Sequence, residues 1–238
     1  MVDPELKDRS AIVVGAAGGI GGALADALAD EGIYGQVHRF SRSAFGAHHI
    51  DITDEASIQA AAARVAGGPA PVMILVASGL LHDGDRGPER ATKELDAAWM
   101  ARNFAVNAIG PALVAKHFLP LMPKTGRTIF AALSARVGSI SDNRLGGWHS
   151  YRASKAALNQ LIRTIAIEER RRNSSSVVVA LHPGTVDTAL SKPFQGNVAK
   201  GHLFDSGRAA VQLLDVLDGL RPPDSGKLFA WDGVEVTP

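Results

Sequence analysis

The chain has 238 residues, with 25 basic and 24 acidic side chains, 46% hydrophobic residues and a formal net charge of +1 at pH 7. This balance leaves no net field that would hold nucleic acid or an anionic membrane, so a small, neutral or weakly charged partner is expected. The absence of cysteine excludes disulfides and thiolate metal sites and is consistent with a reducing cytoplasm.

Short apolar runs alternate with longer amphipathic runs along the chain. The short runs predict strands at Ala11–Val14, Gln36–Phe40, Val72–Ala77, Arg127–Leu133, Val177–Leu181 and Lys227–Ala230. The longer runs predict helices at Ile20–Glu31, Asp54–Val65, Lys93–Leu121, Tyr151–Arg172 and Ser206–Leu217, with Pro111 starting or kinking a new helix after Asn107. Continuous Val/Ile/Leu strands are typical of sheets covered on both faces. We therefore expect one α/β domain over residues 1–238, a Rossmann-type, doubly wound, mostly parallel sheet flanked by helices on both faces.

Several sequence features argue against other functions. The start, MVDPELKDRS, lacks the basic and apolar zones of a signal peptide. The longest apolar run, from Val72 to Leu81, is too short to span a bilayer. The eight histidines show no metal-ligand spacing, so no metal site is expected. We accordingly expect neither a membrane nor a nucleic acid as partner.

A glycine-rich turn follows the first predicted strand and opens the first predicted helix. Glycines let the backbone turn tightly and approach a phosphate, and a helix N-terminus presents free N–H groups to an anion. This placement favours binding of a dinucleotide pyrophosphate over a glycine turn without a ligand. The candidate residues are Gly15, Gly18, Gly19, Ile20 and Gly21.

The end of the second predicted strand, HRFSRS, indicates which dinucleotide is bound. An acidic residue there would bind the ribose 2′-hydroxyl, whereas a basic residue accommodates a 2′-phosphate. Ser41 stands where that acid would be, and Arg42 and Arg39 supply positive charge, so NADP(H) is favoured and NAD(H) is possible; the alternative is that these arginines only solvate a strand end. Asp51, followed by Ile52, is a candidate acceptor for the adenine amino group, and Thr53 or Asp54 can cap the next helix.

Tyr151 and Lys155 are four residues apart at the start of an apolar, alanine-rich helix. One turn of helix places both side chains on the same face. A nearby ammonium favours the phenolate, so the spacing predicts a lowered tyrosine pKa and a labile phenolic proton. The alternative is a helix in which Tyr151 packs in the core and Lys155 is solvated.

These motifs together resemble the short-chain dehydrogenase/reductase family, in its short single-domain branch. The resemblance spans essentially the whole chain. It rests on the glycine turn, Asp51-Ile52-Thr53-Asp54, Asn107, the Tyr151/Lys155 pair and the segment PGTVDT from Pro183 to Thr188. The stretches SARVGSISDNRLGGW and SGKLFAWDG are most similar to carbonyl-reductase and C-factor-like members.

The resemblance implies a role for each matching residue. Tyr151 would be the general acid/base, Lys155 would lower its pKa and bind the nicotinamide ribose, and Asn107 would hold a water that links Lys155 to solvent. The remaining residues implied to contact the cofactor are Ala77, Ser78, Gly79, Pro183, Gly184, Val186 and Thr188. Residues 189–204 would form a lid or wall that selects the substrate.

The sequence departs from the family at the serine that usually polarises the substrate carbonyl. With Gly138 as anchor, Ala135 occupies that place, and we assign the role to its neighbour Ser134, with Ser139 and Ser141 as alternatives. Val14, Val76 and Ala77 also replace residues usual in the family, which puts efficient turnover in doubt.

We expect an NADP-dependent oxidoreductase that reduces a small ketone or aldehyde, or oxidises the corresponding alcohol, as a cytoplasmic homodimer or homotetramer. The alternative is a catalytically weak or inactive NADP-binding sensor or signalling protein. A sugar-nucleotide epimerase is disfavoured because too little chain follows Pro183 to form the additional domain of such enzymes.

Overall fold

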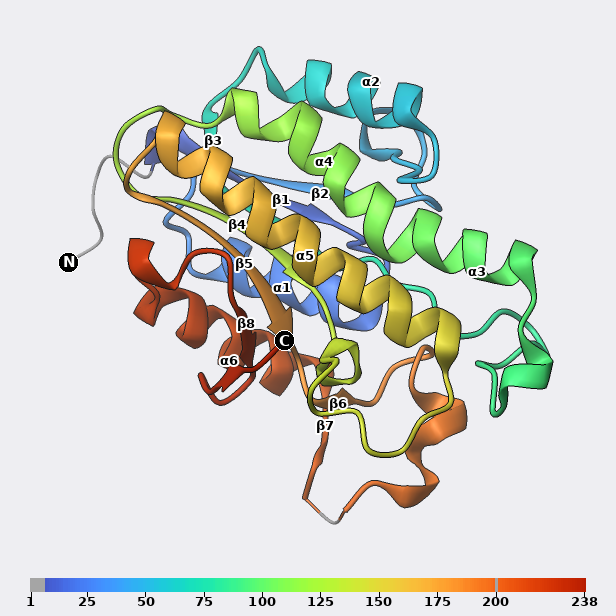
Figure 1. Cartoon of the computed structure of the whole chain (residues 1–238). Coiled ribbons are helices and arrows are strands. Elements are labelled where there is room, and N and C mark those ends of the chain that lie inside the picture. The colour runs from blue at the N-terminus through green and yellow to red at the C-terminus, as the bar shows by residue number, and fades with distance from the viewer. Residues whose placement is uncertain (1–6, 200) are drawn as a thin grey trace.

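The computed structural model describes residues 7–199 and 201–238 and confirms the predicted fold class (Figure 1). The polar start of the chain, MVDPELKDRS, lies partly outside these residues. Position 200 of the predicted substrate loop lies outside them as well. The strands form a sheet with the order β2-β1-β3-β4-β5-β8-β9. Neighbouring strands in this sheet are parallel except for the last pair, β8 and β9.

All of the predicted strands are present, with ends that differ by at most about two residues, as expected for boundary assignments. They are β1 (Arg9–Val14), β2 (Gln36–Phe40), β3 (Ala70–Val76), β4 (Thr128–Leu133), β5 (Ser176–His182) and β8 (Leu228–Ala230). The sequence analysis missed three short strands: β6 (Thr185–Val186), β7 (Leu203–Phe204) and β9 (Glu235–Val236). β6 pairs with β7 in a separate two-stranded sheet, which ties together the two ends of the loop that follows β5.

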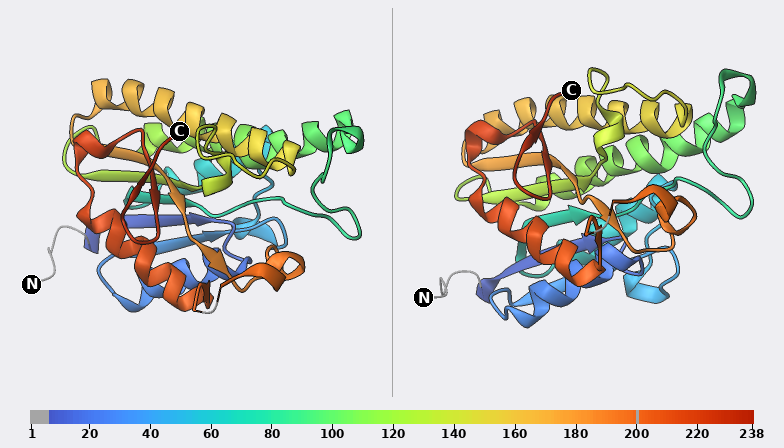
Figure 2. Two further views of the ribbon diagram at one scale, coloured as in Figure 1. Left: turned by 60° about the horizontal axis from the view of Figure 1, so that its bottom comes forward. Right: turned by 90° about the horizontal axis from the view of Figure 1, so that it is seen from below.

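Helices cover both faces of the sheet, as two further views of the molecule make clear (Figure 2). One face packs against α1 (Gly19–Asp30) and α6 (Ser206–Gly219), and the other against α2 (Glu55–Val65), α4 (Gly110–Phe118) and α5 (His149–Arg172). Successive residues of a strand point to opposite faces of the sheet. Ile12 belongs to the core between the sheet and α2, α4 and α5, whereas Val13 belongs to the core between the sheet and α1 and α6. Short 3₁₀ turns occupy Gly46–His48, Thr92–Glu94, Leu119–Leu121, Arg136–Gly138, Lys192–Asn197 and Pro222–Asp224.

The long central helix predicted at Lys93–Leu121 is interrupted. A 3₁₀ turn precedes Asp96, whose carboxylate caps α3 (Ala97–Phe104), and a π-helical turn, η4 (Ala105–Ile109), joins α3 to α4. The prediction that Pro111 starts or kinks a new helix is confirmed, since α4 begins directly after the π turn and has the proline in its first turn. By length and composition the stretch Ala97–Leu121 could cross a membrane, but Phe118 is fully buried in the core of the sheet.

Candidate active site

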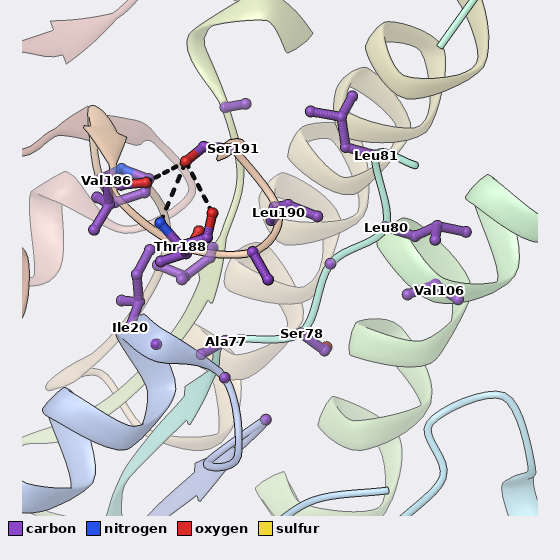
Figure 3. A pocket seen from close by; sticks show the side chains of 18 of the residues that line it. Ile20, Ala77, Ser78, Leu80, Leu81, Val106, Val186, Thr188, Leu190 and Ser191 are labelled. Atoms are coloured by element: carbon purple, nitrogen blue, oxygen red, sulfur yellow. Dashed lines mark hydrogen bonds between the residues drawn. The ribbon is translucent and has the colours of Figure 1, made fainter. Parts of the chain in front are cut away.

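A cavity of about 700 Å³ opens at the carboxyl ends of the parallel strands, and β1 to β5 each contribute a residue or a following loop to it (Figure 3). In doubly wound sheets this edge is where ligands bind. Eighteen of the predicted site residues line the cavity: Gly15, Gly18, Gly19, Ile20, Ser41, Arg42, Asp51, Ile52, Ala77, Ser78, Gly79, Ser134, Tyr151, Lys155, Pro183, Gly184, Val186 and Thr188. Two predicted residues, Gly21 and Asn107, do not line it and lie behind its wall.

The glycine turn fits a pyrophosphate. Gly15 has a φ of 93°, and a Cβ there would lie 2.9 Å from the carbonyl carbon of Ala77, so only glycine is tolerated. A Cβ on Gly19 would lie 2.7 Å from Cγ2 of Thr188, so the bare backbone leaves space between the start of α1 and the segment after β5. α1 begins there without a side-chain cap, which leaves its first N–H groups available to an anion.

Gly21 has a packing role in this turn. A Cβ on Gly21 would collide with the carbonyl oxygen of Gly15 and would also lie 3.1 Å from Cβ of Ala77. α1 can therefore approach β1 and β3 closely only because this position lacks a side chain. Gly21 thus determines the shape of the glycine turn without lining the cavity.

At the other end of the cavity, the structure distinguishes the arginine within β2, Arg39, from the arginine that follows β2, Arg42. Arg39 forms an ion pair with Asp26 at 2.5 Å and donates to the carbonyl of Ala25 at 3.0 Å, so it is held against α1. Arg42 lines the cavity beside Ser41 and Asp51. Of the two, Arg42 is therefore the cation available to a ligand.

The Asp51 carboxylate is charged and partly exposed. Burial alone would raise its pKa, but hydrogen bonds from the amide and hydroxyl of Thr53, at 2.9 and 2.7 Å, and the charge of Arg42 hold the pKa below its ordinary value. One of the two proposed helix caps is confirmed, because Asp54 accepts from the amide of Ala56 at the start of α2.

Tyr151 and Lys155 lie one turn apart on α5, as predicted, and both are buried. The Lys155 ammonium nitrogen Nζ is 5.8 Å from the centre of the Tyr151 ring and donates to the carbonyl of Leu133 at 2.8 Å. A Cβ on Gly138 would lie 2.8 Å from Cβ of Lys155, so the turn after β4 packs directly on this part of the helix. The structure thus brings the pair to the cavity together.

The predicted lowering of the Tyr151 pKa is wrong for this structure. Burial raises the pKa of Tyr151 to about 12, and burial lowers the pKa of Lys155 to about 7. The two desolvation effects oppose the formation of either charge and outweigh the attraction between an ammonium and a phenolate. At neutral pH the phenol therefore retains its proton and can act as a proton donor.

Asn107 lies in the π turn η4 and is completely buried. Its side chain accepts from the amide of Leu80 and donates to the carbonyl of Leu80, both at 2.8 Å, and also donates to Ser154 Oγ at 3.0 Å. A Cβ on Gly79 would lie 3.8 Å from Asn107 Oδ1 and 4.0 Å from Lys155 Nζ. Asn107 therefore holds the loop after β3 against α5 and reaches the same space as Lys155.

The residues at the end of β4 show how the chain departs from a serine-containing site. Ser134 lines the cavity, but its hydroxyl donates to Oδ1 of Asn159 at 2.7 Å. Ala135 instead packs with Tyr151 and Leu81 in a small apolar cluster. The assignment of Ser134 as carbonyl donor therefore stays a prediction.

The two alternative serines are placed elsewhere. Ser141 donates to the carbonyl of Pro238 at 2.6 Å, and Ser139 Oγ accepts from the amide of Asp142 at 3.1 Å. Neither is among the residues that line the cavity.

The segment after β5 closes one side of the cavity with a hydrogen-bonded turn that the sequence analysis missed. Ser191 donates to the carbonyl of Val186 at 2.5 Å, and its oxygen accepts from the amide of Thr188 at 3.3 Å (Figure 3). Gly184 has a φ of 75°, and a Cβ there would lie 2.8 Å from the ring of Phe204 on β7. The predicted loop, residues 189–204, is thus held at both of its ends. Its residues 189–191 and 194 line the cavity.

The far end of the cavity, beyond Tyr151, is apolar. Trp148 packs edge-on against Tyr151 and Phe194, with ring centres 6.2 and 5.1 Å apart. The other apolar residues at this end are Leu80, Leu81, Val106, Ala135, Val137 and Leu190. No sequence period marks these residues, because they come from separate loops and turns that meet only in the folded chain.

The two arginines at this end are already paired. Arg102 contacts Asp83 at 2.6 Å, and Arg136 contacts Asp142 at 3.6 Å. Their charges are thereby partly neutralised by the protein itself.

The sequence matches the short chain dehydrogenase family over residues 9–198. It is 37% identical over 179 residues to the C-signal protein of Myxococcus xanthus, covering 75% of this chain and 99% of that protein. It is 30% identical over 185 residues to 1-hydroxy-2-glutathionyl-2-methyl-3-butene dehydrogenase of Rhodococcus sp. strain AD45, covering 77% and 76%.

Among solved structures, the fold is similar to the NADPH-bound carbonyl reductase from chicken fatty liver. The TM-score is 0.79 at 26% identity, and the match covers 97% of this chain and 99% of that one. The carbonyl reductase Sniffer of D. melanogaster shares the fold, with a TM-score of 0.74 at 20% identity. With the glycine turn and the Tyr151/Lys155 pair at one cavity, these matches show that the chain belongs to the short-chain dehydrogenase family and is an NAD(P)-dependent oxidoreductase.

Proposed function

We propose that the protein catalyses NADP-dependent reduction of a small, uncharged ketone or aldehyde, or oxidation of the corresponding alcohol. The observation that carries this proposal is the placement of the protonated Tyr151 phenol and the Lys155 amine in the cavity that begins at the glycine turn. The bound nicotinamide would supply or accept the hydride. The protein's own residues must then supply the proton and hold the substrate oxygen near it.

Each polar residue has a part in this proposal. Tyr151 donates its proton to the substrate oxygen, and Lys155 both stabilises the resulting phenolate and binds the nicotinamide ribose. Asn107 and Lys155 flank the space at Gly79, where a water could return the proton from solvent. Ser134 acts as carbonyl donor only if its hydroxyl turns from Asn159 to the substrate.

The proposed substrate is uncharged and carries an apolar or aromatic substituent. The walls beyond Tyr151 are formed by Trp148, Phe194, Leu81 and other apolar side chains. A carboxylate or phosphate on the substrate would have to compete with Asp83 and Asp142 for the arginines at this end. These walls instead favour binding through the burial of apolar surface of the substrate.

For the cofactor, we propose NADP(H) over NAD(H), with Arg42 and Ser41 at the 2′-phosphate. The chicken relative in the similar structure binds NADPH, which supports this choice. Replacing Arg42 with alanine should weaken NADPH binding about tenfold to hundredfold and leave NADH binding unchanged, because one charge-assisted contact is lost. Arg39→Ala is the matched control, since Arg39 is held by Asp26. An equal loss of affinity for NADPH and NADH in Arg42→Ala, or a larger loss of NADPH affinity in Arg39→Ala, would contradict the assignment.

The test of the reaction is NADPH consumption with a panel of aryl, alkyl and carboxylated carbonyl compounds. We expect turnover of apolar ketones or aldehydes and little turnover of charged ones. Tyr151→Phe should keep NADPH binding and lower kcat by at least about a hundredfold, since it removes the proton donor. A Tyr151→Phe rate equal to that of the unaltered chain would refute the proposed mechanism.

The second candidate function is an NADP-binding sensor or signalling protein with little turnover. It is favoured by Ala135 at the usual serine place and by the 37% identity to a protein named C-signal. In that case NADPH would bind, but no compound in the panel would be reduced at a Tyr151-dependent rate. The two candidate functions are therefore separated by the same experiment.

We propose a cytoplasmic homodimer or homotetramer, assembled through the helices around α4 and α5. Ile109 at the end of η4 and Ile167 on α5 are about half exposed, at 50% and 47%, which leaves apolar surface on these helices in the single chain. Light scattering of the purified chain gives its mass in solution. A monomer at all concentrations would refute this assembly.

A further inference from the structure

Glu89 is a buried acid within an exposed loop. Residues 83–87 and 90, in the segment between β3 and α3, are exposed, whereas Glu89 is only 3% exposed. The same segment supplies Leu80 and Leu81 to the cavity wall. A carboxylate is rarely buried in a surface loop unless specific groups bind it.

The groups that bind Glu89 all lie at the start of α5. The amide of Ser150 donates to the Glu89 carboxylate at 3.1 Å, and the hydroxyl of Ser150 donates to its other oxygen. The amide of Trp148 donates to the backbone carbonyl of Glu89 at 2.5 Å. Ser150 is itself completely buried and immediately precedes Tyr151.

α5 lacks the usual means of starting a helix. Its N-cap residue is Trp148, whose side chain forms no cap hydrogen bond and whose backbone is in the left-handed region, with φ 53°. Left-handed backbone in a bulky residue is costly and persists only where the surroundings impose it. The first N–H groups of the helix need acceptors, and a negative charge is stabilised there.

Apart from His149, which itself lies at the start of α5, no charge explains why Glu89 is buried. Within residues 7–199 and 201–238, no lysine or arginine lies within ion-pair distance of its carboxylate. Burial alone would raise the pKa of Glu89, but the hydrogen bonds from Ser150, with one from the amide of Glu89 itself and the charge of His149, outweigh burial and hold the pKa below its ordinary value. The charged form of Glu89 is thus stabilised by the start of α5.

We propose that Glu89 is a positioning residue that caps the catalytic helix from a distant loop, and thereby fixes both Tyr151 and the aromatic wall at Trp148 relative to the substrate. This inference rests on the proposed function. Ser150 transmits the contact to the next residue, Tyr151, and Trp148 transmits it to the ring contacts with Tyr151 and Phe194. The loop after β3, which forms part of the cavity wall, is fixed by the same contacts.

The experiment compares Glu89→Ala, Glu89→Gln and the control Glu94→Gln in the full chain. Glu94 lies in the same segment and is exposed, and among the residues that the structure describes its carboxylate accepts only from the amide of Arg90. Three quantities are measured: kcat and KM for a carbonyl substrate, the Kd of NADPH, and amide hydrogen exchange at the start of α5. The last two need no turnover.

We expect Glu89→Ala to lower kcat about tenfold to hundredfold, because small misplacement of a catalytic group has effects of this size. The Kd of NADPH should stay unchanged, and exchange at the start of α5 should become faster. Glu89→Gln should recover most of kcat, since its amide oxygen can still accept from Ser150, and Glu94→Gln should match the unaltered chain.

Other results overturn the inference. If Glu89→Ala keeps full kcat, or if NADPH binding falls in parallel with kcat, Glu89 does not specifically position Tyr151. Failure of Glu89→Gln to recover kcat would show that hydrogen bonding to Ser150 is not the cause. If the unaltered chain itself has no turnover, the proposed function fails instead, and unchanged exchange in Glu89→Ala would then overturn the cap as well.

Discussion

At the scale of single residues, burial rather than mutual distance determines the protonation of Tyr151 and Lys155. The helical spacing correctly predicts that the two side chains share a face. However, the attraction between the Lys155 ammonium and a Tyr151 phenolate, with the ammonium 5.8 Å from the ring centre, does not offset the energetic cost of burying the phenolate. Lys155, with a pKa of about 7, is only partly charged at neutral pH. Binding of a negatively charged cofactor beside it should raise that pKa, since a nearby negative charge favours the ammonium.

This leads to a prediction for cofactor binding. At about pH 8 the Lys155 amine is mostly neutral before binding and becomes charged on binding, so NADPH should bind with uptake of a proton. Affinity should accordingly fall as the pH rises above about 7. Calorimetry in buffers of different ionisation enthalpy measures the uptake. Lys155→Met should abolish it, and an uptake that is absent in the unaltered chain would contradict the assigned protonation.

The missing serine gives a second prediction at this scale. Ala135 lies against Tyr151, whereas the Ser134 hydroxyl is bound to Asn159, so a hydroxyl at position 135 should be better placed to polarise a carbonyl. We expect Ala135→Ser to raise kcat by about tenfold or more, because one such donor contributes at least that much. If Ser134 already acts as the donor, Ser134→Ala will lower kcat about a hundredfold and Ala135→Ser will have no effect. Steady-state kinetics of the two variants distinguish these outcomes.

At the scale of elements, the approach of α1 to the sheet depends on a single glycine. A side chain on Gly21 would collide with the carbonyl oxygen of Gly15, which forms the turn. We predict that Gly21→Ala lowers the free energy of unfolding by about 1–3 kcal/mol, as is typical of overpacking, and weakens NADPH binding by distorting the turn. Gly219→Ala in α6 is the control, because nothing lies within 4 Å of a Cβ there. Denaturation and NADPH titration test both effects, and a Gly21→Ala variant that resembles the control would contradict the packing role.

The elements that the sequence predicts are those with strong local signals. Continuous runs of Val, Ile and Leu predict the buried strands β1, β3 and β5, and the Asp54 cap is visible as an acid before an apolar period. The elements missed are those that depend on distant partners. β6 and β7 are two residues each and exist because they pair with one another.

The start of α5 and the π turn also have features that depend on distant partners and were therefore not predicted. The sequence predicts helix at both places, but not that Trp148 adopts a left-handed conformation or that Asn107 lies in a widened turn. Both features are associated with contacts to the loop between β3 and α3. Trp148 is hydrogen-bonded to Glu89 of this loop, and Asn107 is hydrogen-bonded to Leu80. The spacing of residues within one helix carries no information about such contacts.

At the scale of the whole molecule, the site exists because five parallel strands end at one edge. The order β2-β1-β3 reverses direction at β1, so the loops after β1 and β3 leave toward opposite faces and open a crevice between them. The alternation of strands and helices predicts a doubly wound, mostly parallel sheet, whereas the strand order itself comes from the structure. It also explains why most of the predicted cofactor residues line one cavity, although they are spread from Gly15 to Thr188.

The substrate end of the cavity could not be predicted in the same way. Its residues, such as Leu81, Trp148 and Phe194, come from three loops without periodic pattern, and they meet only when the sheet and helices bring those loops together. Their apolar character and the pairing of Arg102 and Arg136 with acids are properties of the folded chain. If the proposed function holds, substrate choice depends on tertiary contacts, whereas the motifs proposed to bind the cofactor are recognisable in the sequence.

The central claim is that the cavity transfers a hydride to a carbonyl with Tyr151 as proton donor. Its most direct test is transfer of deuterium from NADPH labelled at nicotinamide C4 to an apolar ketone, followed by mass spectrometry of the alcohol. The account predicts deuterium on the carbinol carbon of the product with the unaltered chain, and at least about a hundredfold slower transfer with Tyr151→Phe. Binding of the labelled cofactor without any transfer, or transfer at the same rate in Tyr151→Phe, would contradict it.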